Sequence, residues 1–224
     1  MFRIGLAFIR KDILLLLGRG SALCQALLLG LVVIFVFSLG QSVGEKLSPQ
    51  GAATVFWLSS LFCQVLLATQ LFAIEEVNQT KIPLLMLPIP TQVIWLSKTI
   101  TALMTLLLAQ LLFLPATLIF LGQTGDNNFG HAFLGLLLVD LGLCSLSTLL
   151  GALAQGQGQK ESLLSLLLFP LLTPLLLAGI SIFAHFLGEP NAEIATWFAI
   201  ASAFDALFLG AGCLLFPSIY SGDA

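Results

Sequence analysis

Two acidic residues lie inside long apolar runs of this 224-residue chain, at a depth where a charged side chain is costly in a membrane. Asp140 occurs in LLLVDLGL, and Asp205 occurs in SAFDALF. Such a carboxylate either contacts a substrate or accepts a structural hydrogen bond from a Ser or Thr of a neighbouring helix. Neither stretch matches the YD and GxGD pattern of intramembrane aspartyl proteases. We therefore keep both residues as candidate pathway positions and an intramembrane aspartyl enzyme as an alternative.

The two histidines fall near the predicted outer face of the membrane. Two imidazoles on one face could ligate a haem iron, although nothing in the spacing of His131 and His185 shows that they meet. An ordinary interfacial role is the simpler interpretation. The four cysteines lie in apolar runs without a CxxC or Cys/His cluster, so no metal site is predicted. A Walker pattern GxxxxGKS/T does not occur, so we do not expect this chain to bind ATP by that mechanism.

Composition decides the class of protein. Apolar residues make up 58% of the chain and charged residues 8%, against roughly 25% charged residues in a soluble domain. With a mean hydropathy of +1.08, the chain has too little polar surface to cover a water-soluble core. We predict an all-α membrane protein with several spans. The sequence has no basic patch that would indicate a nucleic-acid partner.

The apolar runs are long enough to cross a hydrocarbon core of about 30 Å, which takes about 20 helical residues. Before the first run, Leu6, Ile9 and Ile13 recur at helical spacing with Arg10 off that stripe, which is typical of an amphipathic interfacial helix at residues 1–20. A tail at 217–224 follows the last run. The six predicted spans lie at about residues 21–41, 52–74, 96–121, 132–154, 163–187 and 195–216.

The basic residues predict the orientation in the membrane. Only Lys46 falls on the predicted outer side. The other seven basic residues fall on the side of the N-terminus, namely Arg3, Arg10, Lys11, Arg19, Lys81, Lys98 and Lys160. The positive-inside rule then places the N-terminus in the cytoplasm, and six spans bring the C-terminus back to the same side. Trp57, Trp95 and Trp197 fall near predicted span ends, where we interpret them as interfacial anchors.

The segment at residues 75–95 lies between the second and third spans and carries Pro83, Pro88 and Pro90. Proline removes a backbone donor and disfavours helix at the preceding residue, so LMLPIP cannot be the middle of a regular helix. Unpaired backbone groups are not tolerated against lipid. We predict a short cytoplasmic surface helix at about residues 78–87 followed by a turn. Such a helix is a natural contact for a soluble partner.

Two prolines interrupt the fifth predicted span, Pro170 and Pro174 in LLFPLLTPLL. A proline inside a helix frees a carbonyl and kinks the helix. We interpret both as a packing kink, and a hinge beside a pathway is the alternative. In the sixth span Ala195, Ala199 and Ala203 recur every four residues, a spacing that permits close contact with another helix.

Two stretches resemble a known family. LLMLPIPTQVIWLSKTI (84–100) and LLSLLLFPLLTPLLLAGI (163–180) resemble haem exporter protein B (CcmB), the permease subunit of the cytochrome c maturation ABC transporter. The basic N-terminal helix and the six-span layout agree, so the resemblance covers nearly the whole chain. It implies an ABC-2-like fold and a homodimer in the bacterial inner membrane. The implied partners are the cytoplasmic ATPase CcmA, the membrane proteins CcmC and CcmD, and the haem chaperone CcmE.

The resemblance also implies a mechanism. This chain would be a non-catalytic permease subunit that binds no cofactor, with ATP bound by the partner ATPase and haem as the candidate cargo. It would couple ATP hydrolysis to release of the haem-loaded chaperone. The chain departs from many family members at Asn78, Gln79 and Ile82, where they carry acidic residues or glycine. The residues expected to couple to the ATPase are Glu75, Glu76, Asn78, Lys81, Leu84, Leu85, Met86, Leu87, Pro88 and Pro90.

Other functions fit the same layout. An ABC-2 permease that exports a lipid or a glycan would have the same spans and the same surface helix. A purely structural scaffold for a haem-handling partner would not need the surface helix. Few polar groups line the predicted spans, which favours transmission of motion over a hydrophilic pore.

Overall fold

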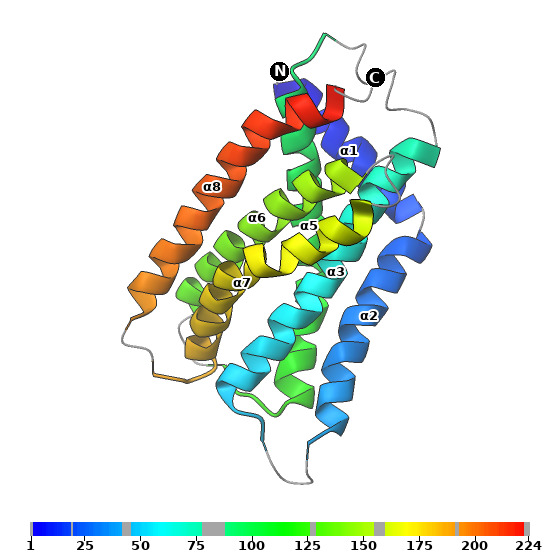
Figure 1. The fold of residues 1–224 in the computed structure, drawn as a ribbon. Coiled ribbons are helices and arrows are strands. Elements are labelled where there is room, and N and C mark those ends of the chain that lie inside the picture. The colour runs from blue at the N-terminus through cyan, green and yellow to red at the C-terminus, as the bar shows by residue number, and fades with distance from the viewer. Residues whose placement is uncertain are drawn as a thin grey trace.

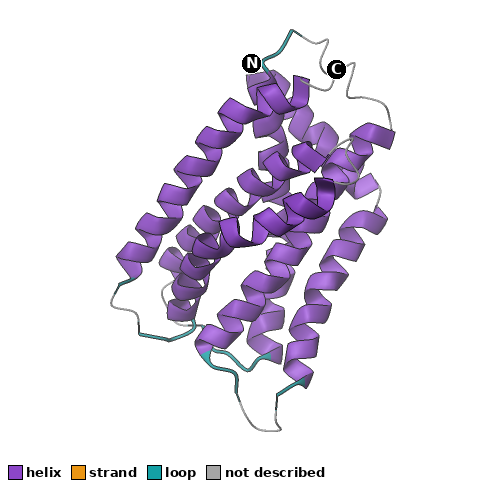
Figure 2. Ribbon diagram, viewed as in Figure 1, coloured by secondary structure: helices purple, strands orange, loops and turns teal. Residues whose placement is uncertain are grey.

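A computed structural model describes residues 2–18, 20–41, 46–77, 88–125, 129–154, 160–190 and 193–221. Every regular element among these residues is a helix, as Figure 2 shows. The helices are α1 (Phe2–Gly18), α2 (Gly20–Leu39), α3 (Pro49–Val77), α5 (Thr91–Phe120), α6 (Phe129–Ala154), α7 (Lys160–Phe186) and α8 (Ile194–Ser221). The predicted all-helical class is confirmed.

Four helices of the described chain are long and apolar enough to cross a membrane: Pro49–Ala73, Thr91–Phe120, Phe129–Leu153 and Ile194–Ile219. Two shorter apolar helices, Leu23–Leu39 and Pro170–Phe186, lie where the first and fifth spans are predicted. The structure therefore agrees with a membrane protein. The prediction that the chain crosses the membrane six times stays a prediction.

The helices form one bundle around α3, α5 and α6, which all contact one another (Figure 1). Helix α2 packs on α3 and α5, whereas α7 and α8 pack on α6. Helix α1 lies against α5 at the end of the bundle where α3 ends, α5 begins and α8 ends (Figure 1). We call this the termini end, and the other end, where α7 ends and α3 and α8 begin, the opposite end.

Glycines allow aromatic rings to enter the contacts between helices. Gly179 of α7 faces the ring of Trp57 of α3, where an added Cβ would lie 2.8 Å from a ring carbon, and Gly212 of α8 faces Trp95 of α5 in the same way. Both tryptophans are fully buried, with 1% and 0% of their surface exposed. The prediction that they anchor the chain at the membrane interface is therefore wrong. Small residues such as these two glycines allow helices in lipid to approach one another closely.

Much of the outer surface of the bundle is apolar. Large side chains on the outer faces of α2 and α5 are exposed, including Val36, Leu111 and Ile119 at 58%, 70% and 75%. A soluble protein does not expose such a continuous apolar surface, whereas a lipid environment requires it. On α8 the alanines Ala195 and Ala199 also lie on the exposed side, so the predicted small-residue seam faces away from this chain's own core.

Helix α7 bends part-way along its length, as Figure 1 shows. Pro170 and Pro174 both lie inside this helix. Each proline lacks the N–H that would bond to the carbonyl four residues earlier, and its ring crowds that carbonyl. The bend therefore has an identifiable cause in the sequence.

The glycine at position 212 offers a test of the packing. Gly212→Ala places a methyl group against the buried Trp95 ring, whereas Gly210→Ala enters open space on the same helix. Both changes raise helix propensity by about 0.5–1 kcal/mol, but overpacking costs about 1–3 kcal/mol. We expect a lower melting temperature for Gly212→Ala in detergent and an unchanged or higher one for Gly210→Ala. Equal melting temperatures would contradict the packing.

Candidate functional site

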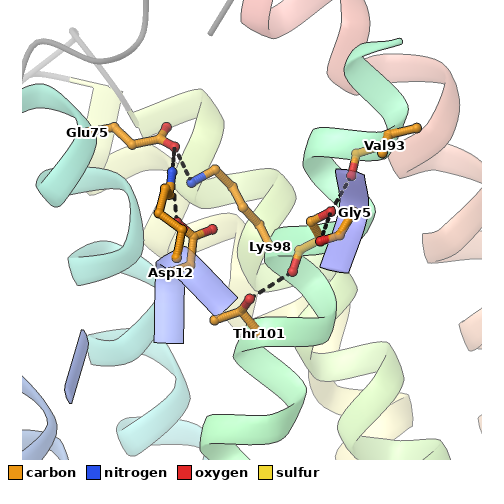
Figure 3. A network of polar contacts seen from close by, with 8 residues as sticks. Gly5, Asp12, Glu75, Val93, Lys98 and Thr101 are labelled. Carbon is orange, nitrogen blue, oxygen red and sulfur yellow. Dashed lines mark hydrogen bonds and ion pairs between the residues drawn. The ribbon is translucent and has the colours of Figure 1, made fainter. Parts of the chain in front are cut away.

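Four charged residues from three helices meet at the termini end of the bundle (Figure 3). Lys98 Nζ of α5 lies 2.7 Å from Glu75 Oε1 of α3. Lys11 Nζ of α1 lies 3.9 Å from the same glutamate oxygen and 3.0 Å from Asp12 Oδ1. We call these four residues the charge cluster. It joins α1, α3 and α5 by charge-assisted contacts.

The charge cluster is buried and has no net formal charge. Glu75, Lys98 and Asp12 are only 2%, 1% and 6% exposed, whereas the Lys11 side chain is partly exposed. An unpaired charge at such a position would be very costly, and pairing offsets that cost. The Lys98 ammonium also lies 4.7 Å from the centre of the Phe72 ring, an attractive cation–π arrangement.

The charge cluster stands at the base of the segment that is predicted to contact the ATPase. Glu75 lies in the last turn of α3, which ends at Val77, and Lys98 lies in the second turn of α5, which begins at Thr91. The ion pair therefore ties together the two helices between which the segment is inserted. Residues 78–87, with Asn78, Lys81, Leu84, Leu85, Met86 and Leu87, lie outside the described residues.

The remaining predicted coupling residues lie at the two edges of that segment. Glu76 belongs to the last turn of α3, next to the buried Glu75. Pro88 and Pro90 are exposed, and Pro90 directly precedes the first residue of α5, where a missing N–H costs nothing. The edges of the segment thus combine a buried charge on α3 with exposed prolines before α5.

Helix α1 is fixed along its length to the same region. Near its start, the Ser97 hydroxyl of α5 lies 3.5 Å from the Gly5 carbonyl, and it also donates to the Val93 carbonyl at 2.7 Å (Figure 3). Near its end, Leu16 is buried against Leu71 of α3. The other face of α1 is exposed, which is what an interfacial helix requires.

Buried hydrogen bonds continue from the charge cluster into the bundle. The hydroxyl of Thr99, the residue directly after Lys98 in α5, lies 3.0 Å from the hydroxyl of Thr148 in α6. Deeper in the bundle, Gln64 Nε2 of α3 donates to Ser147 Oγ of α6 at 2.8 Å. Gln110 Nε2 of α5 donates to Asp140 Oδ1 of α6 at 2.8 Å. These contacts, which we call the polar line, join α3, α5 and α6 at several depths.

The two aspartates face different neighbours. Asp140 is fully buried against Gln110, whose amide also lies 3.3 Å from Ser60 Oγ. The Asp205 carboxylate of α8 lies against Gly142, where an added Cβ would be 2.5 Å from its Oδ1. Position 142 is about 200° around α6 from position 140. The two carboxylates thus lie on opposite sides of α6, and they do not form the shared site that a two-aspartate enzyme needs.

The histidines also have separate surroundings. The His131 ring lies 6.4 Å from the Phe198 ring, whereas His185 Nδ1 lies 3.0 Å from the Glu189 carbonyl oxygen. Within the described residues no group of three or more His, Cys, Asp or Glu side chains could hold a metal ion.

Asp12, Gln64 and Gln110 are site residues that no motif of the sequence predicts, and the sequence predicts Lys98 only as a basic residue of the cytoplasmic side. Gln64 and Gln110 are isolated polar residues within apolar runs, whereas Asp12 and Lys98 have polar neighbours at the edge of an apolar run. Polar residues at such positions usually bond across helices, and this signal could have found them.

Comparison with protein families matches residues 3–216 to the family described as CcmB protein. The chain belongs to the CcmB family. A comparison with curated proteins finds no match. Membership in the CcmB family means c-type cytochrome biogenesis and haem transport by an ABC transporter, in which this chain is a non-catalytic membrane component. The family suggested by residues 84–100 and 163–180 is thereby confirmed.

The buried ion pair of this CcmB protein can be tested by a double-mutant cycle. Glu75→Gln leaves the Lys98 ammonium buried without its carboxylate partner, and Lys98→Met removes the nearer of the two lysines beside Glu75. Breaking a buried ion pair from one side costs about 3–5 kcal/mol. We expect both single variants to melt at clearly lower temperature in detergent, and the double variant to regain most of the loss. Lys46→Met, which removes an exposed lysine at the opposite end, serves as the control. Single variants as stable as this control would refute the ion pair.

Proposed function

We propose that this chain transmits the motion of a cytoplasmic ATPase through the membrane and that the charge cluster is the first element to receive it. The observation that carries the proposal is the Glu75–Lys98 ion pair at 2.7 Å, which ties α3 to α5 at the base of the surface segment. A displacement of that segment therefore moves both helices together. Helix α1 follows because Lys11 belongs to the same cluster.

The proposed path continues through the polar line. Nucleotide-driven closure of the ATPase CcmA pushes residues 78–90, and α3 and α5 carry the displacement to α6 through their buried hydrogen bonds. Hydrogen-bonded contacts between packed helices transmit such shifts because they hold one arrangement rather than deforming continuously. In the complete complex, CcmA binds ATP, and the energy of ATP hydrolysis drives the release of haem-loaded CcmE.

The cavities support transmission of motion over a hydrophilic pore. A groove of about 420 Å³ beside α5 and α6 is lined by apolar side chains and the single amide of Gln110. The buried polar side chains of the polar line pair with one another across helices. We further propose an ABC-2-like fold with six spans, a homodimer with CcmC and CcmD as membrane partners, and both termini in the cytoplasm of the bacterial inner membrane. A lipid or glycan exporter gains no support from CcmB membership.

If the surface segment docks on the ATPase, changes in that segment should remove the ATPase from the purified complex. Leu85→Asp or Met86→Asp places a charge in the apolar part of the segment, so we expect CcmA to be lost on co-purification while the chain still inserts. Thr124→Asp, at an exposed position of the opposite end, should retain CcmA. If both segment variants still co-purify with the normal amount of CcmA, the docking proposal is wrong.

The role of the two aspartates is tested in cells that lack the gene. Haem staining of membranes should show that c-type cytochromes are absent, that the native gene restores them, and that the Met86→Asp gene does not. Asp140→Asn should restore the stain, because an amide oxygen can still accept the Gln110 hydrogen bond. Asp205→Asn should restore it as well, because the amide keeps the size of the carboxylate that lies against Gly142. Loss of the stain with both Asn variants at normal protein level would instead favour the aspartyl enzyme.

A further inference from the structure

A small polar pocket lies at the opposite end of the bundle, away from the charge cluster. It has a volume of about 110 Å³, and its polar lining comes from Gln50 in the first turn of α3, Ser181 and His185 of α7, and Glu189 just after α7. This pocket joins the end of α7 to the start of α3. No part of the proposed coupling path uses it.

The end of α7 builds the pocket. The Gly188 N–H bonds to the His185 carbonyl at 3.1 Å, and the Glu189 N–H bonds to the Ala184 carbonyl at 3.0 Å. Together with the positive φ of +99° at Gly188, these bonds form a Schellman cap. The cap reverses the chain after α7, and it thereby returns Glu189 over the last turn of the helix, beside His185.

The hydrogen bond of His185 determines which ring nitrogen is basic. Nδ1 lies 3.0 Å from the Glu189 carbonyl oxygen. A carbonyl can only accept a hydrogen bond, so Nδ1 carries the proton in the neutral ring and Nε2 keeps its lone pair. A backbone carbonyl bonded to the second ring nitrogen is the usual support of a metal-binding histidine.

One oxygen of the Glu189 carboxylate in the same lining also lacks a hydrogen-bond donor. Glu189 Oε2 is buried, and among the described residues nothing donates a hydrogen bond to it. The lining of the pocket therefore includes an imidazole and a carboxylate, which are both electron-pair donors. The amide oxygen of Gln50 and the hydroxyl of Ser181 add two neutral oxygen atoms to the same lining.

We infer that His185 and Glu189 form a binding site for one divalent transition-metal cation, for which Zn²⁺ is the suitable probe. Zn²⁺ takes imidazole nitrogen and carboxylate oxygen together, and water or neutral oxygen atoms complete its shell. The pocket is too small for a haem, because sites for ligands of even drug size measure about 300–1,000 Å³. A bound ion would join α7 to α3 at the end of the bundle that lacks the charge cluster.

The test uses the full-length chain in detergent, purified with an affinity tag that contains no histidine. Zn²⁺ titration by calorimetry should show one saturable site, and Co²⁺ should give the visible absorption bands of a nitrogen- and oxygen-ligated ion. His185→Gln and Glu189→Gln should each weaken Zn²⁺ binding by at least about tenfold. His131→Gln, which changes the other histidine, should bind as the native chain does.

A rise in melting temperature with Zn²⁺ provides a second readout. It should occur in the native chain and in His131→Gln and be absent from the two pocket variants. Glu189→Gln keeps the size of the side chain, so it decides the matter if His185→Gln does not fold. No saturable Zn²⁺ binding, or equal binding by the native chain and Glu189→Gln, would overturn the inference.

Discussion

The buried ion pair between Glu75 and Lys98 constrains the whole termini end of the bundle. Both side chains have almost no exposed surface, so neither charge can leave the pair without a large desolvation cost. A buried pair contributes little net stability, but separating it is expensive, and its main effect is therefore on geometry. The end of α3 and the beginning of α5 must keep their mutual position whenever the segment between them is displaced.

The surrounding lipid explains why such contacts matter in this bundle. Apolar side chains gain little by leaving lipid for one another, so helices in a membrane associate through close packing and polar contacts. The rings of Trp57 and Trp95 against glycines provide the close packing, and the polar line provides the hydrogen bonds. The three mutually contacting helices, α3, α5 and α6, contain the polar line and the two oppositely charged residues of the Glu75–Lys98 pair.

The two ends of the bundle differ in chemistry. At the termini end, opposite charges satisfy one another, and α1 covers them. At the opposite end, His185 and Glu189 present electron pairs to a small pocket. This asymmetry fits the coupling role proposed for the termini end and the cation site inferred at the opposite end.

Much of the fold could be predicted because lipid restricts the choices. A chain with 58% apolar residues in long runs must form helices, since each backbone group needs an internal partner. The prolines at 170 and 174 predicted an irregular α7, and the stretches at 84–100 and 163–180 predicted the CcmB family, which the comparison confirmed. The burial of the candidate site was harder to predict. A lone lysine near a span end is usually exposed, and only the tertiary structure shows that Glu75 pairs with Lys98 inside the bundle.

The sequence by itself determined the class of protein, the helical segments and the family, because these depend on composition, run length and local motifs. Only the tertiary structure decided which faces of the helices meet. Asp140 and Asp205 share an apolar setting in the sequence, yet they lie on opposite sides of α6. Trp57 and Trp95 are buried because glycines far away in the sequence make room for their rings. Periodicity shows which residues share one face of a helix, whereas the partner of that face is chosen by packing between distant segments.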